Sequence, residues 1–158
     1  MLLLATLEAS AAGIPLNPIA RWEWVFPLVE SLHILGFTLL VGSVVVLDFR
    51  LLGICLQRSP ISQLARDLAP YIWAGIFVQL TTGPYLFSGD PGDYVQVTAF
   101  RNKMAFLLVA LTFHIAVMGK ATAAKWDDAT PAWRKPVALV SLASWLSVLL
   151  AGVWIGSL

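Results

Sequence analysis

Few ionisable side chains interrupt the apolar segments of this chain, and one glutamate and two histidines among them suggest a cofactor site. Glu30 and His33 stand three residues apart in "ESLHILGFTLLVGSVVVLD", and His114 is the only other histidine. Neutral imidazole is a common iron ligand, and two imidazoles from facing helices form the six-coordinate site of a b-type haem. We therefore predict haem b with His33 and His114 as axial ligands. Glu30 would accept a hydrogen bond from His33, and Gly36, one turn further along, would leave room for the ring.

The depths of the two histidines agree only in part with this prediction. His33 lies twelve residues after Arg21 and His114 thirteen residues after Arg101, so their depths match when counted from these outer charges. Counted from the charges at the other ends of the same segments they differ, and averaging the two counts leaves an offset of roughly 7 Å at ~1.5 Å per residue. A helix tilt of ~20° or an extended first helix could absorb that offset.

Motifs for other cofactors and for catalysis are absent from the sequence. It contains no C-x-x-C-H, no H-E-x-x-H, no serine-nucleophile motif and no phosphate-binding glycine loop. The single E-x-x-H formed by Glu30 and His33 is half of what a di-iron bundle requires. We therefore expect that the protein is not an enzyme by itself. Two alternatives to haem stay open: a small proton-coupled carrier that uses Glu30 and His33, and a non-catalytic subunit or assembly partner of a larger membrane complex.

Two further charges, Asp48 and Arg50, stand near the inner end of the first apolar segment. Residues two apart on a helix point in different directions, so each needs a partner from elsewhere, and Lys120 or Arg66 could pair with Asp48. We interpret Asp48 and Arg50 as an interfacial charge cluster that fixes the depth of the helix, since long basic side chains commonly snorkel at helix ends.

The composition indicates an integral membrane protein. Apolar residues make up 59% of the 158 residues and charged residues 12%, and the mean hydropathy is +0.81. A soluble domain of this size could not bury so much apolar surface. The net charge of +1 gives no basic excess that would indicate a nucleic-acid partner. Cys55 is the only cysteine, so an internal disulfide is impossible.

Four apolar segments, 23–47, 69–88, 103–119 and 136–157, each come close to the ~20 residues that a helix needs to cross a bilayer. Only helices and closed barrels satisfy their backbone groups in lipid, and none of the segments alternates as a barrel strand does. The predicted fold is therefore all-α, an integral membrane four-helix bundle with up-down-up-down topology in a single domain, residues 1–158. Residues 1–12 are too short to span and predict a short N-terminal interfacial helix.

The distribution of Lys and Arg predicts the orientation, because cytoplasmic loops carry an excess of these residues. Seven of the ten basic residues fall on one side of the predicted spans, against Arg21, Arg101 and Lys103 on the other. Both termini would then be periplasmic, and the protein would be a multi-pass protein of the bacterial inner membrane.

Small and polar residues in the spans indicate how the helices pack. Gly152 and Gly156 form a G-x-x-x-G, which we interpret as a face packed inside the bundle, with a homodimer interface as the alternative. Gln79 and Thr82, together with Thr81, predict interhelical hydrogen bonds, and Gly83 with Pro84 predicts a kink.

The whole chain resembles an uncharacterised family of small four-span bacterial integral membrane proteins. The resemblance is carried by "WVFPLVESLHILGFTLLVGSVVVLDFRLLG" (24–53), "FRNKMAFLLVALTFHIAV" (100–117) and the closing "SWLSVLLAGVWIGSL". Its most specific features are a histidine followed three residues later by a glycine, the aspartate and arginine of "DFRLLG", and the lysine at the start of the third segment. It implies the fold and the membrane location and supplies no activity.

Overall fold

The structure is a computed structural model that describes residues 24–89, 91–122 and 131–156. Within these ranges every regular element is a helix, as the sequence predicted. The helices are α2 (Val25–Leu52), α3 (Ile61–Phe87), α4 (Pro91–Gln96), α5 (Thr98–Thr122) and α6 (Pro131–Gly156). The predicted interfacial helix over residues 1–12 lies outside the described residues.

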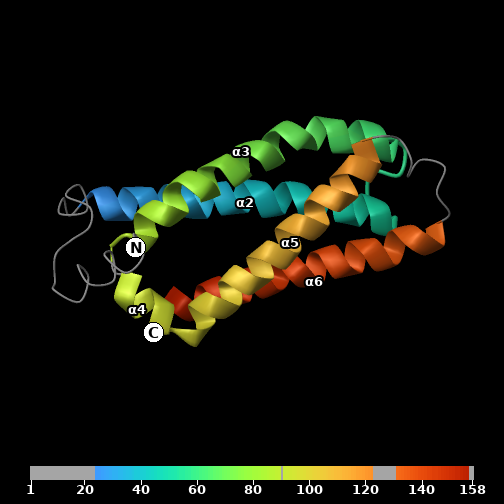
Figure 1. The fold of residues 1–158 in the computed structure, drawn as a ribbon. Helices are drawn as coiled ribbons and strands as arrows, with labels where there is room; N and C mark the ends of the chain where they lie inside the picture. Colours follow the sequence, from blue (N-terminus) through green and yellow to red (C-terminus); the bar gives the residue numbers. More distant parts are fainter. Residues whose placement is uncertain (1–23, 90, 123–130, 157–158) are drawn as a thin grey trace.

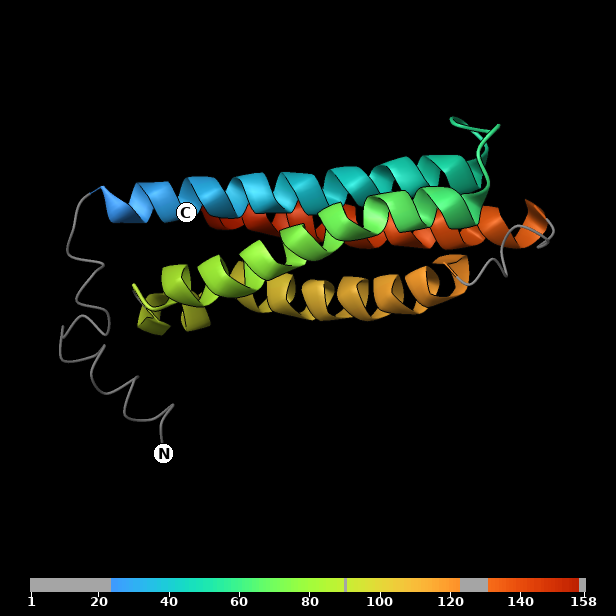
Figure 2. The ribbon, with the colours of Figure 1, turned by 90° about the horizontal axis from the view of Figure 1, so that it is seen from above.

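The four long helices form two pairs. α2 packs mainly against α3, and α5 packs mainly against α6, while less extensive contacts of α2 with α6 and of α3 with α5 join the pairs. The colours in Figure 1 show that consecutive long helices run in opposite directions. Figure 2 shows α2 alongside α6, and α3 running from the side of α2 toward the side of α5. The short helix α4 connects the two pairs at one end.

Three of the described helices are long and apolar enough to cross a membrane: Val25–Leu52, Thr98–Ala121 and Ala132–Ile155. The second predicted span, 69–88, falls within α3, which is not among them. Gln79, Thr82 and Pro84 lower the hydropathy of α3, although the helix has 27 residues. The structure therefore confirms three helices of membrane-spanning character.

The apolar core lies in the half of the molecule away from α4. In α2 it begins at Leu40 and runs to Leu51, and it is completed by residues from the other three long helices, chiefly Ile61, Ile72, Ile76, Ala110, Met118, Trp145 and Val148. On the α4 side of Leu40, the buried residues of α2 are Val25 and Gly36. Figure 1 shows the same asymmetry, because the α2–α3 pair and the α5–α6 pair stand apart at the α4 end and come together at the other end.

Two glycines let α2 and α3 approach closely. A Cβ added to Gly75 would lie 2.7 Å from the Leu40 Cβ and 2.8 Å from the Gly36 carbonyl oxygen. A Cβ added to Gly36 would overlap the Val78 side chain. Backbone atoms block a Cβ at Gly75, and the β-branched Val78 side chain blocks one at Gly36, so both helices need glycine there.

Replacing Gly75 with alanine is expected to destabilise the protein by about 1–3 kcal/mol, as overpacking a tight contact does. The matched control is Gly42→Ala, because a Cβ at Gly42 meets no protein atom within 4 Å. The control should be neutral or gain up to ~1 kcal/mol from helix propensity. Thermal unfolding in one detergent measures both variants. Equal stability of the two would show that α2 and α3 do not approach at Gly75.

Candidate functional site

His33 is held by α3 through a short chain of hydrogen bonds. Its Nδ1 lies 2.7 Å from Oγ1 of Thr82, and that hydroxyl donates to the carbonyl oxygen of Val78 at 2.6 Å. Because the one hydroxyl proton of Thr82 is donated to Val78, the Thr82 oxygen accepts a hydrogen bond from the Nδ1–H of His33. The network thus assigns the proton of the neutral ring to Nδ1 and leaves the lone pair on Nε2.

Gln79 adds a second bond between the same two helices. Its Nε2 donates to the backbone carbonyl of His33 at 2.6 Å. The prediction of interhelical hydrogen bonds is therefore confirmed for Gln79 and Thr82. Thr81 instead donates to its own helix, to the carbonyls of Phe77 and Val78, both at 3.0 Å. The position and rotation of the imidazole are fixed by α3.

Lys103, near the start of α5, is a basic residue whose charge acts on this imidazole. Its ammonium lies close enough to His33 for their charges to interact. A Cβ added to Gly152 of α6 would lie 3.5 Å from the Lys103 Nζ and 3.6 Å from its Cε. In the part of the chain that the structure describes, no salt bridge joins Lys103 to an acidic residue. Lys103 thus lies against Gly152 of α6, and its charge reaches His33 of α2.

The two other residues predicted beside His33 are placed differently from what the sequence suggested. Gly36 faces Val78 and Gln79 of α3. These side chains fill the space beside Gly36, so the glycine leaves no open patch. Glu30 is exposed, and the described partner of the His33 Nδ1 is Thr82 and not Glu30. Gly152, in turn, faces Lys103 within the chain, in line with the interpretation of its row as an internal packing face.

His114 has a different neighbourhood from His33. It is 3% exposed, and its ring meets that of Trp145 edge-on, with centroids 6.2 Å apart. Trp145 also contacts Phe37, one turn beyond His33, with centroids 6.4 Å apart. His114 lies eleven residues beyond Lys103, which is about 16 Å along α5 at ~1.5 Å per residue. Trp145 thus lies between the His114 ring and the Phe37 ring, which stands one turn beyond His33.

Asp48 is a buried residue whose position the sequence interpretation missed. Its side chain is only 1% exposed and accepts a hydrogen bond from Ser141 of α6, so it is no interfacial charge. Lys120 and Arg66, the partners considered from sequence, are both exposed. The periodicity of α2 could have revealed this, because Asp48 stands four and eight residues after the buried Val44 and Leu40.

Among the described residues there is no cluster of three or more His, Cys, Asp or Glu side chains that could hold a metal ion. A metal bound here would need most of its ligands from elsewhere. An imidazole with a fixed Nδ1–H is nevertheless arranged as metal-ligating histidines are, since these usually donate their second ring N–H to an acceptor.

Comparison with known proteins gives one match. A family model described as "Family of unknown function (DUF6644)" matches residues 25–158. No curated protein and no solved structure matches the chain. The resemblance to an uncharacterised family, expected from the sequence, is thereby confirmed.

Proposed function

Because the chain belongs to this family of unknown function, its activity has to be inferred from its own residues, and we propose that it binds haem b through His33 and transfers electrons. The haem would lie between the α2–α3 and α5–α6 pairs, in the half of the molecule near α4. The observation that carries the proposal is the hydrogen-bond chain from His33 through Thr82 to Val78. It leaves the lone pair of Nε2 available to a ligand and restrains the orientation of the ring.

Haem suits a site with a single fixed imidazole. A haem brings four nitrogen ligands of its own, so the protein has to supply only an axial one. This agrees with the absence of a cluster of protein ligands in the part of the chain described. When bound, a haem supplies one-electron chemistry by cycling its iron between the ferric and ferrous states.

Lys103 supports an anionic cofactor in particular. A cation inside a membrane span is costly unless it meets an opposite charge. Within the described residues Lys103 lies against Gly152, acts electrostatically on His33 and forms no salt bridge. A haem propionate is a carboxylate that would neutralise it. We therefore assign His33 to the iron and Lys103 to a propionate.

The proposal differs from the bis-histidine site that the sequence suggested in one respect. His114 stands about 16 Å further along α5 than Lys103 at ~1.5 Å per residue and packs on Trp145. We propose that haem binding does not require it. The iron would then be five-coordinate, or its sixth position would be taken by a ligand from outside this set of residues.

We further propose that α3 also spans the membrane, so that α2, α3, α5 and α6 form an up-down-up-down four-helix bundle in the bacterial inner membrane with both termini in the periplasm. The packing of α3 along α2 and the excess of Lys and Arg at the end of the molecule opposite α4 support this. The site of His33 would then lie in the periplasmic half of the membrane.

Cys55 offers a native probe of this orientation, since it is the only cysteine and lies between α2 and α3. A membrane-impermeant maleimide is expected to label it in inverted vesicles and not in intact spheroplasts. Detergent-permeabilised spheroplasts give the control for accessibility, because Cys55 is half-buried. A Cys55→Ser chain with Gly92→Cys should show the opposite pattern. Labelling of Cys55 in intact spheroplasts would reverse the orientation.

Titration of the purified protein with haemin tests the function itself. One haemin per chain is expected to bind, with a shifted Soret band and a sharp end point. Excess haemin in protein-free detergent gives the background. If the absorbance instead rises linearly with added haemin, as it does in protein-free detergent, the protein does not bind haem.

A second candidate function, proton transfer, is favoured by a group of buried polar atoms at the level of Trp145. Asp48 Oδ2, His114 Nε2 and Trp145 Nε1 are all buried and have no hydrogen-bond partner among the described residues. Ionisable residues inside a span mark proton relays as well as ligand sites. Proteoliposomes with a trapped pH dye test it, because Asp48→Asn would stop a proton flux that depends on this group.

A further inference from the structure

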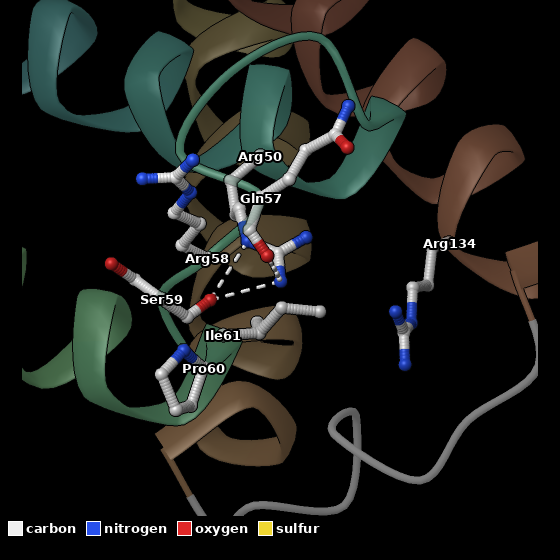
Figure 3. Close-up of a pocket in the computed structure, with 7 residues that line it drawn as sticks. All are labelled: Arg50, Gln57, Arg58, Ser59, Pro60, Ile61 and Arg134. Carbon is white, nitrogen blue, oxygen red and sulfur yellow. Dashed lines mark hydrogen bonds between the residues drawn. The ribbon is translucent and has the colours of Figure 1, made fainter.

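A pocket of about 400 Å³ opens at the end of the molecule opposite α4. It is lined by Arg50 at the end of α2, by Gln57, Arg58 and residues 59–61 of the following turn, and by Arg134 in the first turn of α6 (Figure 3). Its volume lies within the ~300–1,000 Å³ typical of ligand pockets. It is separate from the site of His33, which lies toward the α4 end.

The walls of this pocket are strongly basic. Three of the seven described lining residues are arginines and none is acidic. In the view of Figure 3 the guanidinium group of Arg50 lies between those of Arg58 and Arg134, and that of Arg58 points away from Arg134. Guanidinium groups favour carboxylate and phosphate oxygens, which they bind in pairs of hydrogen bonds. The pocket is therefore built for an anion.

Arg50 is fixed in place by the turn that follows α2. Its Nε and Nη2 donate to the Ser59 carbonyl at 3.0 and 2.9 Å, and Nη2 also reaches the Gln57 carbonyl at 3.3 Å. Gly53 makes the turn possible, because it ends α2 at φ 79°, in the left-handed region. A preordered cation loses less freedom on binding than a flexible one.

The N-terminus of α3 adds to the positive field. α3 begins at Ile61, and its N-cap is Pro60, which makes no side-chain capping bond in the described structure. The first turn of a long helix carries a partial positive charge and exposes N–H groups. Since residues 59–61 line the pocket, this terminus reinforces the arginines that line it.

The surroundings of the pocket favour a lipid as the anion. Arg50 and Arg134 lie at the ends of two helices that qualify as membrane spans. Large apolar side chains nearby are exposed, with Trp133 at 73% and Ile54 at 65%. A phosphate at the membrane surface with acyl chains beside it matches this combination, and basic pockets between spans bind such headgroups. We propose that the pocket binds the phosphate of an anionic phospholipid on the side of the membrane that carries the excess of Lys and Arg.

The test uses the full chain, purified in mild detergent, with phosphatidylglycerol and phosphatidylcholine of identical acyl chains. Native mass spectrometry and the melting temperature report binding. Phosphatidylglycerol is expected to remain bound and to raise the melting temperature, and phosphatidylcholine to do neither. Arg134→Gln should weaken phosphatidylglycerol binding several-fold, Arg134→Lys should recover part of it, and Arg101→Gln, in α5 near the α4 end, should leave it unchanged.

Three outcomes would overturn the proposal. Equal binding of both lipids would mean that the headgroup charge is not recognised. An equal loss in Arg101→Gln and Arg134→Gln would mean that only the net charge matters. A melting-temperature rise of the same size with inorganic phosphate alone, at matched ionic strength, would make free phosphate the ligand and not a lipid.

Discussion

Replacement of His33 by alanine is expected to abolish haem binding. The variant loses the one imidazole whose Nδ1 proton is fixed by Thr82, and with it the iron ligand that we assign to the protein. Haemin titration should then give no Soret shift and no end point, while the wild-type chain binds one haemin. Circular dichroism and gel filtration in the same detergent check that the variant keeps its helices and its size.

His114→Ala is the matched control, because it removes the only other histidine of the chain. Since His114 packs on Trp145 and we propose that haem binding does not require it, this variant should bind haemin as the wild-type chain does. A folded His33→Ala chain that still binds haemin would rule out His33 as the ligand. Loss of binding in both variants would instead support the bis-histidine site.

Thr82→Val is expected to weaken haem binding by about 10–100-fold, the usual effect of removing the partner of a metal-ligating histidine. Valine has the shape of threonine but accepts no hydrogen bond, so the proton of the imidazole is no longer held on Nδ1. The orientation of the ring is lost as well. Haemin dissociation constants, measured by titration at fixed pH and detergent, give the effect.

Thr82→Ser keeps the hydroxyl and serves as the control, with binding expected within a few-fold of wild type. Thr81→Val, one residue away, removes a hydroxyl that donates only within α3 and should have no effect. If Thr82→Val binds haemin as tightly as Thr82→Ser, the hydrogen bond from His33 to Thr82 does not prepare His33 as the iron ligand.

The sequence predicts the helices well but not their ends. The apolar segment at 69–88 lies inside α3, yet that helix begins at Ile61, because a helix continues past the charges that end an apolar run. Pro84 lies within α3 and the helix continues to Phe87. The short helix α4 (Pro91–Gln96) was not predicted, since its polar residues show no apolar periodicity.

The site is predicted in part, because spacing gives the face of a residue on its own helix but not the helix that it meets. His33 was recognised from its position in an apolar segment, whereas its pairing with Thr82 depends on how α2 and α3 are rotated about their axes. Lys103 was noted at the start of the third segment, but only the packing of α5 brings it near His33. His114 was paired with His33 because it is the only other histidine, and Trp145 could not be foreseen beside it.

Asp48 shows the opposite case, in which information in the sequence was sufficient. Leu40, Val44 and Asp48 recur every four residues on α2, so a face that buries the first two also buries the carboxyl. Its closeness to the end of the apolar segment favoured an interfacial interpretation instead. The lesson is that the face of a helix decides burial more reliably than the distance from its end.

The absorption spectrum of the protein, purified from cells that are supplied with a haem precursor, tests haem binding most directly. We predict a red protein with a Soret band in the oxidised form and, after reduction with dithionite, α and β bands of a b-type haem. The pyridine haemochrome should give one haem per chain. A colourless, folded preparation that also takes up no added haemin would contradict the account.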